Sequence, residues 1–257
     1  MRLISQVTFS IYSISTQKIY ILLHGAWHAG WCWLRVVPII TEQGHKVLAP
    51  DLPGHGNNKA YFKSITLKIY IDEVTKLIKL QDKPVILVGH SMSGVIISQL
   101  AENIPEHIEA LVYVSGFIPD NNGSLVHEER KAKIQGVVKE VIVDESNNKI
   151  TLKLSSNIQK LFFNTCSQED ANWAMSKFQA QPFRPFIDTV TLSTQKFKNV
   201  PKFYIECLKD QAIRIEDQKR MYSKINVEVF SLDTDHSPFL CAPQLLSMLL
   251  INIGVKK

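Results

Sequence analysis

The stretch from Pro84 to Gly94, PVILVGHSMSG, constrains the fold of this chain more than any other. An apolar run, Val85 to Val88, ends at Gly-His-Ser-Met-Ser-Gly, and an apolar-periodic segment, Val95 to Ala101, follows directly. This pattern predicts a buried strand that turns sharply into a helix. We expect Ser91 at the tip of this turn, in a strained backbone conformation that pushes its side chain clear of the sheet.

The turn has the form Gly-x-Ser-x-small, in which a strand–turn–helix unit presents a nucleophilic serine. Gly89 occupies the first small position, but Ser93 occupies the second, where glycine is usual, and Gly94 follows one residue later. We expect Ser93 to fit because serine is the next smallest choice, with some crowding at the start of the helix. The alternative is a serine that only caps the N-terminus of an ordinary helix.

Strands and helices alternate through most of the chain. Besides the strand before Ser91, the predicted strands lie at residues 18–23, 45–49, 108–114, 202–207 and 226–231. The predicted helices other than the one after Ser91 lie at residues 31–43, 67–78 and 243–253. Such alternation implies an α/β fold with a parallel sheet and right-handed crossovers.

The alternation breaks between residues 120 and 186, which we interpret as an inserted cap. Residues 140–154 alternate in polarity and are expected to form a hairpin that turns at Asn147 and Asn148. A helical stretch with bulky side chains follows, and part of its apolar surface is expected to face a substrate pocket. The side chains expected at that pocket are Phe162, Phe163, Trp173 and Phe178, with Trp27 and Phe117 from outside the helical stretch. The alternative is a solvent-facing insertion with a minor core of its own.

Three polar residues, Ser91, Asp210 and His236, each follow a predicted central strand. Open parallel sheets place their sites at the carboxyl ends of the strands. A serine hydroxyl becomes a good nucleophile when an imidazole accepts its proton, and a buried carboxylate fixes the imidazole tautomer. We therefore predict that Ser91 is the nucleophile, His236 the base and Asp210 the orienting acid. Asp233 and Asp235 are weaker candidates for the acid, because adjacent side chains such as those of Asp235 and His236 generally diverge.

A second motif, HGAW at residues 24–27, follows the first predicted strand. If the serine of the sharp turn is a nucleophile, this loop and the residue after the serine would each donate a backbone N–H to an oxyanion. Those two residues are Ala26 and Met92. Asp51 and His55 lie in the turn DLPGHG, and we interpret them as loop residues because the acid and base are better placed elsewhere.

Composition restricts the partners of this chain. Its net charge of +5 comes mostly from scattered lysines, so we expect no nucleic-acid partner. Residues 1–15 lack a clear cleavage site and are expected to form an extra strand or hairpin instead of a signal peptide. No apolar run approaches the roughly 18 residues of a membrane span. The cysteines form no C-x-x-C pair and are typical of buried thiols in a reducing, cytoplasmic environment: Cys32, Cys166, Cys207 and Cys241.

Several of these segments together resemble the α/β-hydrolase superfamily: HGAWHAGWCW, DLPGHG, VILVGHSMSG, the aspartate that ends KFYIECLKD, and DHSPFLCAPQLL. Within it, the chain is similar to the branch that holds plant salicylate-binding methylesterases, polyneuridine-aldehyde-type esterases, hydroxynitrile lyases and bacterial relatives. The similarity is good over about residues 18–119 and 200–253. The middle third is loosely similar, with PFRPFIDTVTLS as its best match. The resemblance implies an α/β-hydrolase fold over residues 1–257, with a mostly parallel central sheet, helices on both faces and a cap inserted at about 120–186.

The resemblance also implies an enzyme without cofactor or metal and with a small, largely apolar pocket. Ser91, Asp210 and His236 would form its triad, and Ala26 and Met92 its oxyanion hole. We therefore expect a serine carboxylesterase that cleaves a small carboxylic ester through an acyl-enzyme. Its partner would be the small-molecule ester, and a homodimer stays an open alternative.

Two other functions stay open. A hydroxynitrile lyase would use the same triad for proton transfer, and the plant lyases that this chain resembles carry threonine, cysteine and lysine at three positions of the site. This chain has Ala26, Met92 and Ser237 there, and these departures favour the esterase. The other alternative is a non-catalytic small-ligand receptor of the same fold, against which the intact triad argues.

Overall fold

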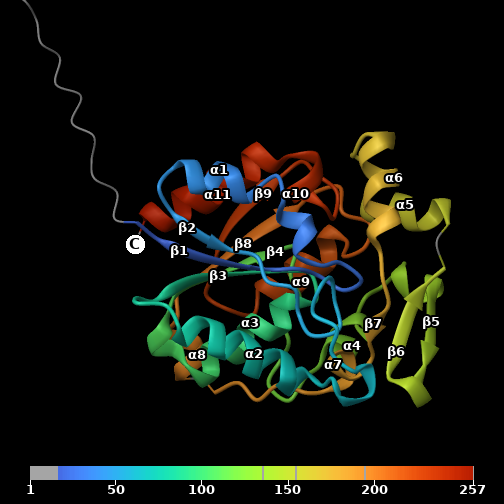
Figure 1. Cartoon of the computed structure of the whole chain (residues 1–257), viewed down its shortest axis with the longest axis horizontal. Coiled ribbons are helices and arrows are strands. Elements are labelled where there is room, and N and C mark those ends of the chain that lie inside the picture. The colour runs from blue at the N-terminus through green and yellow to red at the C-terminus, as the bar shows by residue number, and fades with distance from the viewer. Residues whose placement is uncertain (1–16, 135, 154, 194, 257) are drawn as a thin grey trace, which may run out of the picture.

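A six-stranded sheet forms the centre of the computed structural model, which describes residues 17–134, 136–153, 155–193 and 195–256 (Figure 1). Its strands, in spatial order, are β2 (Lys46–Leu48), β1 (Ile19–Leu23), β3 (Val85–His90), β4 (Ile108–Val114), β8 (Lys202–Cys207) and β9 (Glu228–Leu232). All neighbouring strands are parallel, which confirms the predicted architecture. The strand or hairpin predicted for residues 1–15 lies outside the described residues.

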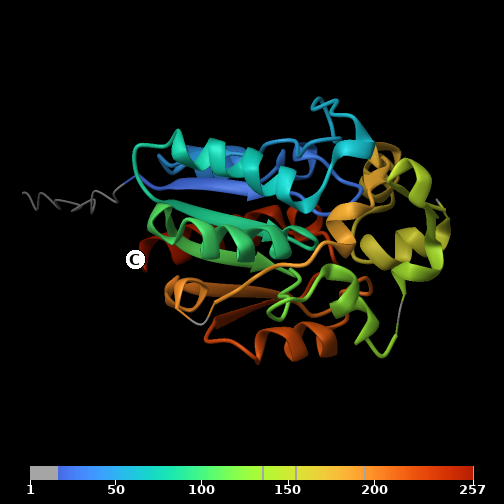
Figure 2. The ribbon, with the colours of Figure 1, turned by 90° about the horizontal axis from the view of Figure 1, so that it is seen from below.

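Helices cover both faces of this sheet, which explains why its central strands are continuous apolar runs. One face carries α1 (Val37–Glu42) and α11 (Pro243–Val255), and the other carries α2 (Leu67–Lys79), α3 (Ser93–Asn103) and α8 (Lys196–Asn199) (Figures 1 and 2). Two further helices, α9 (Ile215–Tyr222) and α10 (Pro238–Cys241), follow β8 and β9 along the chain. All residues of β1 and β3 are consequently buried.

Local sequence sets the ends of several helices. Thr66 caps α2, because its hydroxyl accepts a hydrogen bond from the backbone N–H of Ile69. The helix predicted at residues 31–43, with a kink or late start near Pro38, consists of a 3₁₀ turn, η1 (Gly30–Trp33), and then α1, which starts late because proline suits the first turn of a helix. Gly44 follows α1 with a φ of 83°, a conformation that favours glycine. The other 3₁₀ turns are η2 (Phe62–Ser64), η3 (Pro105–His107), η4 (Val137–Glu140) and η5 (Glu145–Asn147).

The segment predicted to be a cap, residues 120–186, lies between β4 and β8 in the chain and contains an antiparallel sheet of three strands; we keep the name cap for it. Its elements are α4 (Leu125–Arg130), β5 (Val141–Asp144), β6 (Lys149–Leu152), α5 (Ser156–Phe162), α6 (Gln168–Lys177), β7 (Gln181–Pro182) and α7 (Arg184–Ile187). The predicted hairpin is present, with Asn148 in the left-handed conformation at its turn. The cap lies beyond the end of the central sheet that is remote from the C-terminus of the chain (Figures 1 and 2).

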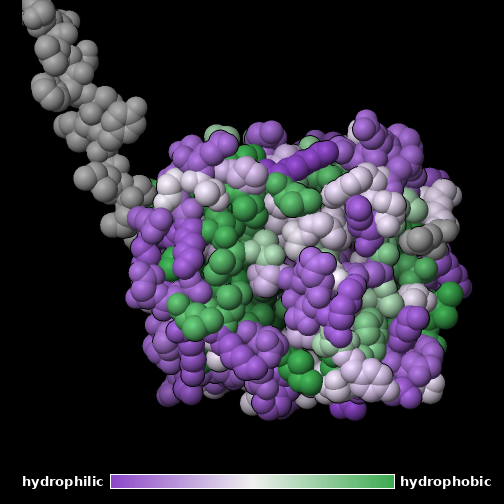
Figure 3. Space-filling view, in the orientation of Figure 1, coloured by the Kyte–Doolittle hydropathy of each residue, from purple (hydrophilic) through white to green (hydrophobic). Residues whose placement is uncertain are grey.

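Hydrophilic side chains cover most of the face shown in Figure 3, and apolar side chains gather in patches between them. The apolar core lies between the central sheet and its two helical layers, and it continues into the cap through side chains such as Phe162. Within the described ranges, no helix combines the length and the apolar character needed to cross a membrane.

Candidate active site

Ser91 lies between β3 and α3 with a φ of 53°, in the left-handed region that few residues other than glycine adopt. Hydrogen bonds hold both sides of this turn. The Ser91 N–H donates to the carbonyl of Val114 at 3.2 Å, and the Ser91 carbonyl accepts from the N–H groups of Gly94 and Phe117, both at 3.0 Å. A Cβ at Gly94 would clash with the carbonyl oxygen of Phe117, so glycine is required there. The sequence therefore folds into the predicted sharp turn with the serine at its tip.

Ser93 fits this turn although it replaces the usual glycine. It is fully buried, and its hydroxyl donates a hydrogen bond to the carbonyl of His24. Gly89 provides the close approach of strand and helix, since a Cβ there would lie 2.8 Å from the carbonyl oxygen of Ser93. The Ser93 hydroxyl therefore connects the turn to the loop after β1.

The imidazole of His236 lies against the carboxylate of Asp210, with 2.7 Å between Nδ1 and Oδ2, and both side chains are buried. An ionised carboxylate only accepts hydrogen bonds, so Nδ1 carries the ring proton and Nε2 presents a lone pair. The N–H groups of Ala212 and Ile213 each donate to Oδ1 of Asp210 at 2.8 Å, and the Ser115 hydroxyl donates to Oδ2. The loop after β8 thus positions the carboxylate for His236.

The two other aspartates considered as the acid have different partners. Asp233 forms an exposed ion pair with Lys209 at 2.6 Å. Asp235 is buried, and its Oδ2 accepts a hydrogen bond from the backbone N–H of Thr165 in the cap at 2.7 Å. Of the three candidates, the structure brings Asp210 to the imidazole.

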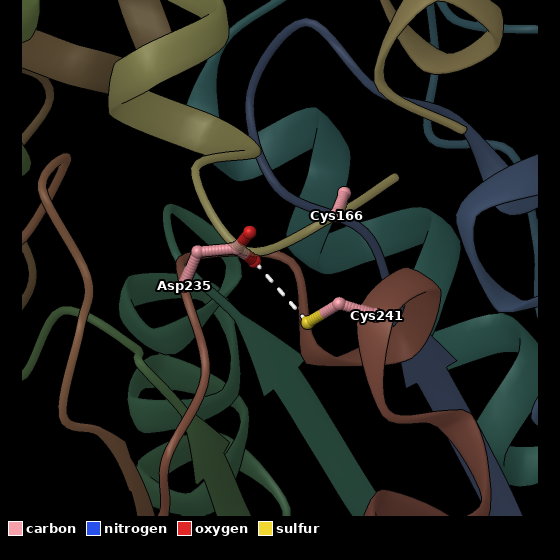
Figure 4. Close-up of side chains that lie close together, drawn as sticks. All are labelled: Cys166, Asp235 and Cys241. Carbon is pink, nitrogen blue, oxygen red and sulfur yellow. Dashed lines mark hydrogen bonds between the residues drawn. The ribbon is translucent and has the colours of Figure 1, made fainter. Parts of the chain in front are cut away.

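Asp235 also belongs to a cluster with Cys166 and Cys241, whose possible ligand atoms all lie within 4.8 Å of one another (Figure 4). The thiol of Cys241 donates to Oδ1 of Asp235 at 3.4 Å. Three ligand atoms are one fewer than a structural zinc site uses. Both oxygens of Asp235 already accept backbone hydrogen bonds, from Thr165 and Ser237. We therefore interpret the cluster as a contact that holds the cap against the loop of His236.

Ser91 and His236 line the same cavity, which has a volume of about 390 Å³. Within the described residues no hydrogen bond joins the Ser91 hydroxyl to the imidazole, and such bonds are often long until substrate binds. His90 fixes the backbone of this loop, because its Nε2 lies 2.8 Å from the His236 carbonyl and donates to it. Burial and the neighbouring His236 hold the pKa of His90 well below its usual value, so the His90 ring stays neutral.

Ala26 and Met92 line the cavity beside Ser91. In the described part of the chain, no protein acceptor pairs with the backbone N–H of either residue. The loop of Ala26 comes close to the serine because Gly25 has no side chain, since a Cβ there would lie 2.9 Å from the Cβ of Ser91. Two free backbone donors are therefore available on the wall of the cavity that carries the serine.

Three of the six side chains predicted for substrate binding line the cavity: Trp27, Phe117 and Phe162. The other three, Phe163, Trp173 and Phe178, are not among the residues that line it. Phe163 and Phe178 pack on each other, with ring centroids 5.6 Å apart, and on His28 beneath the cap. Trp173 lies edge-on to Trp31 and is 37% exposed outside the cavity. The helical stretch of the cap thus divides its aromatic side chains between the cavity, the contact with His28 and the partly exposed contact with Trp31.

Sequence reasoning missed the wall of the cavity that α4 provides. Leu125, Val126, Glu129 and Arg130 line it, and their spacing, which places them on one side of a helix, was the available signal. The cap contributes further apolar lining at Val137, Val138, Val141, Val143, Ile150, Phe183, Phe186 and Ile187, and the loop after β8 contributes Ala212 and Ile213.

Asp51 and His55 are loop residues, as predicted. The carboxylate of Asp51 accepts hydrogen bonds from the backbone N–H groups of Gly30 at 2.7 Å and Asn57 at 2.8 Å. Nε2 of His55 lies 2.9 Å from the side-chain oxygen of Gln181, and burial lowers the pKa of His55 to about 4. Both side chains hold loops in place.

Comparisons with known proteins agree with the fold. The model of the family described as "Alpha/beta hydrolase family" matches residues 20–247. Methylesterase 7 of Arabidopsis thaliana is 30% identical over 256 residues, which cover 94% of this chain and 98% of that protein. Salicylic acid-binding protein 2 of Nicotiana tabacum is 30% identical, with coverage of 93% and 98%. The crystal structure of polyneuridine aldehyde esterase is 25% identical, with a TM-score of 0.82 and coverage of 92% and 99%. The chain therefore belongs to the α/β hydrolase family, and these relatives support a hydrolase.

Proposed function

We propose that this protein is a serine carboxylesterase that cleaves a small carboxylic ester through an acyl-enzyme. The observation that carries the proposal is the imidazole of His236, which lies 2.7 Å from the carboxylate of Asp210 and lines the same cavity as Ser91. The relatives named methylesterase and polyneuridine aldehyde esterase match nearly the whole chain and support ester cleavage.

Acylation of Ser91 would begin when its hydroxyl attacks the ester carbonyl and Nε2 of His236 accepts the hydroxyl proton. Asp210 stabilises the resulting imidazolium through Nδ1. The negative charge on the former carbonyl oxygen is bound by the N–H groups of Ala26 and Met92. When the tetrahedral intermediate collapses, the imidazolium gives its proton to the departing alcohol, and the acyl group stays on Ser91.

Deacylation repeats these steps with water as the nucleophile. His236 accepts a proton from the water as it attacks the acyl carbonyl, and it then returns that proton to Ser91 as the acid departs.

The cavity of about 390 Å³ is at the small end of the usual range for ligand pockets and is lined mostly by apolar side chains. These properties support a small ester with a largely apolar acyl or alcohol group.

The first prediction tests this function through Ser91→Ala. A fluorophosphonate probe should label the wild-type protein but not this variant, and turnover of p-nitrophenyl acetate should fall by several powers of ten. Ser98→Ala is the matched control, because Ser98 is a buried serine of α3 whose hydroxyl donates to the carbonyl of Gly94 at 2.7 Å, and it does not line the cavity. Labelling of Ser91→Ala, or ester turnover that survives in it, would contradict the proposal.

A further inference from the structure

The cavity beside Ser91 contains a carboxyl group that the proposed mechanism does not use. Glu129, in the last turn of α4, lines the cavity together with apolar side chains of the same helix. Apart from Ser91, His236 and Arg130, the other described residues that line the cavity are apolar. Glu129 is therefore the one acidic residue among the described residues that line the cavity in which the acyl or alcohol group of a substrate would lie.

Among the described residues, no side chain forms an ion pair or a hydrogen bond with the carboxyl of Glu129. Two of the neighbouring cations, Arg220 and Lys131, are already paired with other carboxylates. Arg220 binds the buried carboxylate of Glu128 at 2.7 Å and that of Asp217 at 3.3 Å, and Lys131 binds Glu128 at 2.6 Å. Within the described ranges, a carboxylate on Glu129 thus forms no ion pair or hydrogen bond with a cation, although Arg130 lines the same cavity.

These surroundings disfavour the ionised form of Glu129. Burial and the negative charge of Asp217 raise the pKa of the carboxyl to about 7, against the opposing effects of Arg220 and His236. On α7, which packs against α4, Arg184 is paired with Asp188 at 3.0 Å. A cation brought into the cavity would therefore meet a carboxylate that lacks a partner, in a setting less polar than water.

We propose that Glu129 makes this protein prefer esters that carry a positively charged nitrogen within a few bonds of the ester group. The inference rests on the proposed esterase function and adds a substrate class to it. Arg130, which lines the cavity as well, is exposed, so solvent screens its charge more strongly than that of Glu129. The preference for a cation therefore exceeds any preference for an anion.

The second prediction compares two esters of nearly identical shape, acetylcholine and 3,3-dimethylbutyl acetate, which differ in a quaternary nitrogen and the corresponding carbon. Both esters would use the same triad, so the ratio of kcat/KM for acetylcholine to kcat/KM for 3,3-dimethylbutyl acetate removes every effect that acts on the triad alone. At about pH 8 this ratio should be about tenfold higher in the wild type than in Glu129→Gln, a change of about 1.4 kcal/mol. In the wild type this ratio should fall as the pH is lowered from about 8 to about 6, because the carboxyl of Glu129, with its raised pKa, takes up a proton over that range. In Glu129→Gln it should stay flat.

Glu145→Gln is the matched control, because it removes the same charge from an exposed residue of the cap that does not line the cavity. Its ratio should equal that of the wild type. The inference would be overturned if the ratio were the same in the wild type and in Glu129→Gln. It would also be overturned if Glu145→Gln lowered the ratio as much as Glu129→Gln does. A preference for monomethyl succinate, an anionic ester, over both test esters would overturn it as well.

Calorimetric binding of the two product alcohols, choline and 3,3-dimethylbutan-1-ol, gives the same comparison without turnover. The wild type should bind choline more tightly than the neutral alcohol, and Glu129→Gln should lose this difference. If neither ester is cleaved but choline is preferred, the esterase proposal fails and the role of Glu129 stands. If choline is not preferred, the role of Glu129 fails whatever the turnover.

Discussion

Replacing Asp210 by asparagine exchanges one oxygen for an NH₂ group and disrupts the hydrogen bonding around His236. In the native protein, Oδ2 of Asp210 lies 2.7 Å from Nδ1 of His236, and Oδ1 accepts from Ala212 and Ile213 at 2.8 Å. An asparagine whose oxygen stays with these two backbone N–H groups must direct its NH₂ group at Nδ1. The ring proton then moves to Nε2, where the imidazole can no longer accept the proton of Ser91.

We expect Asp210→Asn to lower kcat about 10⁴-fold, which is the effect of the same replacement in the Ser-His-Asp triad of a serine protease. At about 1.36 kcal/mol for each factor of ten, this is about 5.4 kcal/mol of transition-state stabilisation. The hydrogen bond to Nδ1 of His236 is no longer charge-assisted, and for this bond alone the free energy of unfolding should fall by about 1.5 to 3 kcal/mol. The loss of activity should therefore be much larger than the loss of stability.

The assay is kcat for p-nitrophenyl acetate together with thermal unfolding followed by circular dichroism. Asp233→Asn is the matched control, because it makes the same chemical change in the exposed pair with Lys209, and it should keep wild-type activity and stability. The reasoning would be refuted if Asp210→Asn kept kcat within tenfold of the wild type while Asp235→Asn lost it.

Two further predictions concern the cavity wall and the reaction type. Phe162→Ala should change the relative kcat/KM values of esters with different acyl groups, because Phe162 lines the cavity edge-on to the ring of His236. Phe163→Ala should instead lower the free energy of unfolding by about 3 to 5 kcal/mol, because Phe163 is buried outside the cavity, and it should change the activity on all esters alike. If both variants had the same effect on every ester, this distinction between the two side chains would be wrong. The protein should hydrolyse phenyl acetate faster than it releases cyanide from mandelonitrile. The residue after His236 is Ser237 and not a lysine, so this position offers no positive charge to bind a departing anion. Faster cyanide release that disappears in Ser91→Ala would favour the lyase.

The parallel architecture and the sharp turn at Ser91 could be predicted because both depend on residues close together in the chain. The strands predicted at residues 108–114 and 202–207 are present with these bounds as β4 and β8. The apolar run before Ser91, the small residues around it and the periodic segment after it allow few other local structures. Parallel pairing then brings the ends of β3, β8 and β9 to one edge of the sheet, which is why Asp210 and His236 could be expected near Ser91.

The surroundings of individual side chains could not be predicted, because they depend on contacts between residues far apart in the chain. Phe162 and Phe163 are neighbours of the same residue type and both rings lie near His28, yet Phe162 lines the cavity and Phe163 does not. The contact of Asp210 with Ser115 spans 95 residues, and that of Ser93 with His24 spans 69. Glu129 lies in a charged segment typical of a solvated helix, yet it lines the cavity on α4, which packs against α7. A local pattern specifies the backbone, whereas the direction in which each side chain is buried depends on how the cap packs on the sheet.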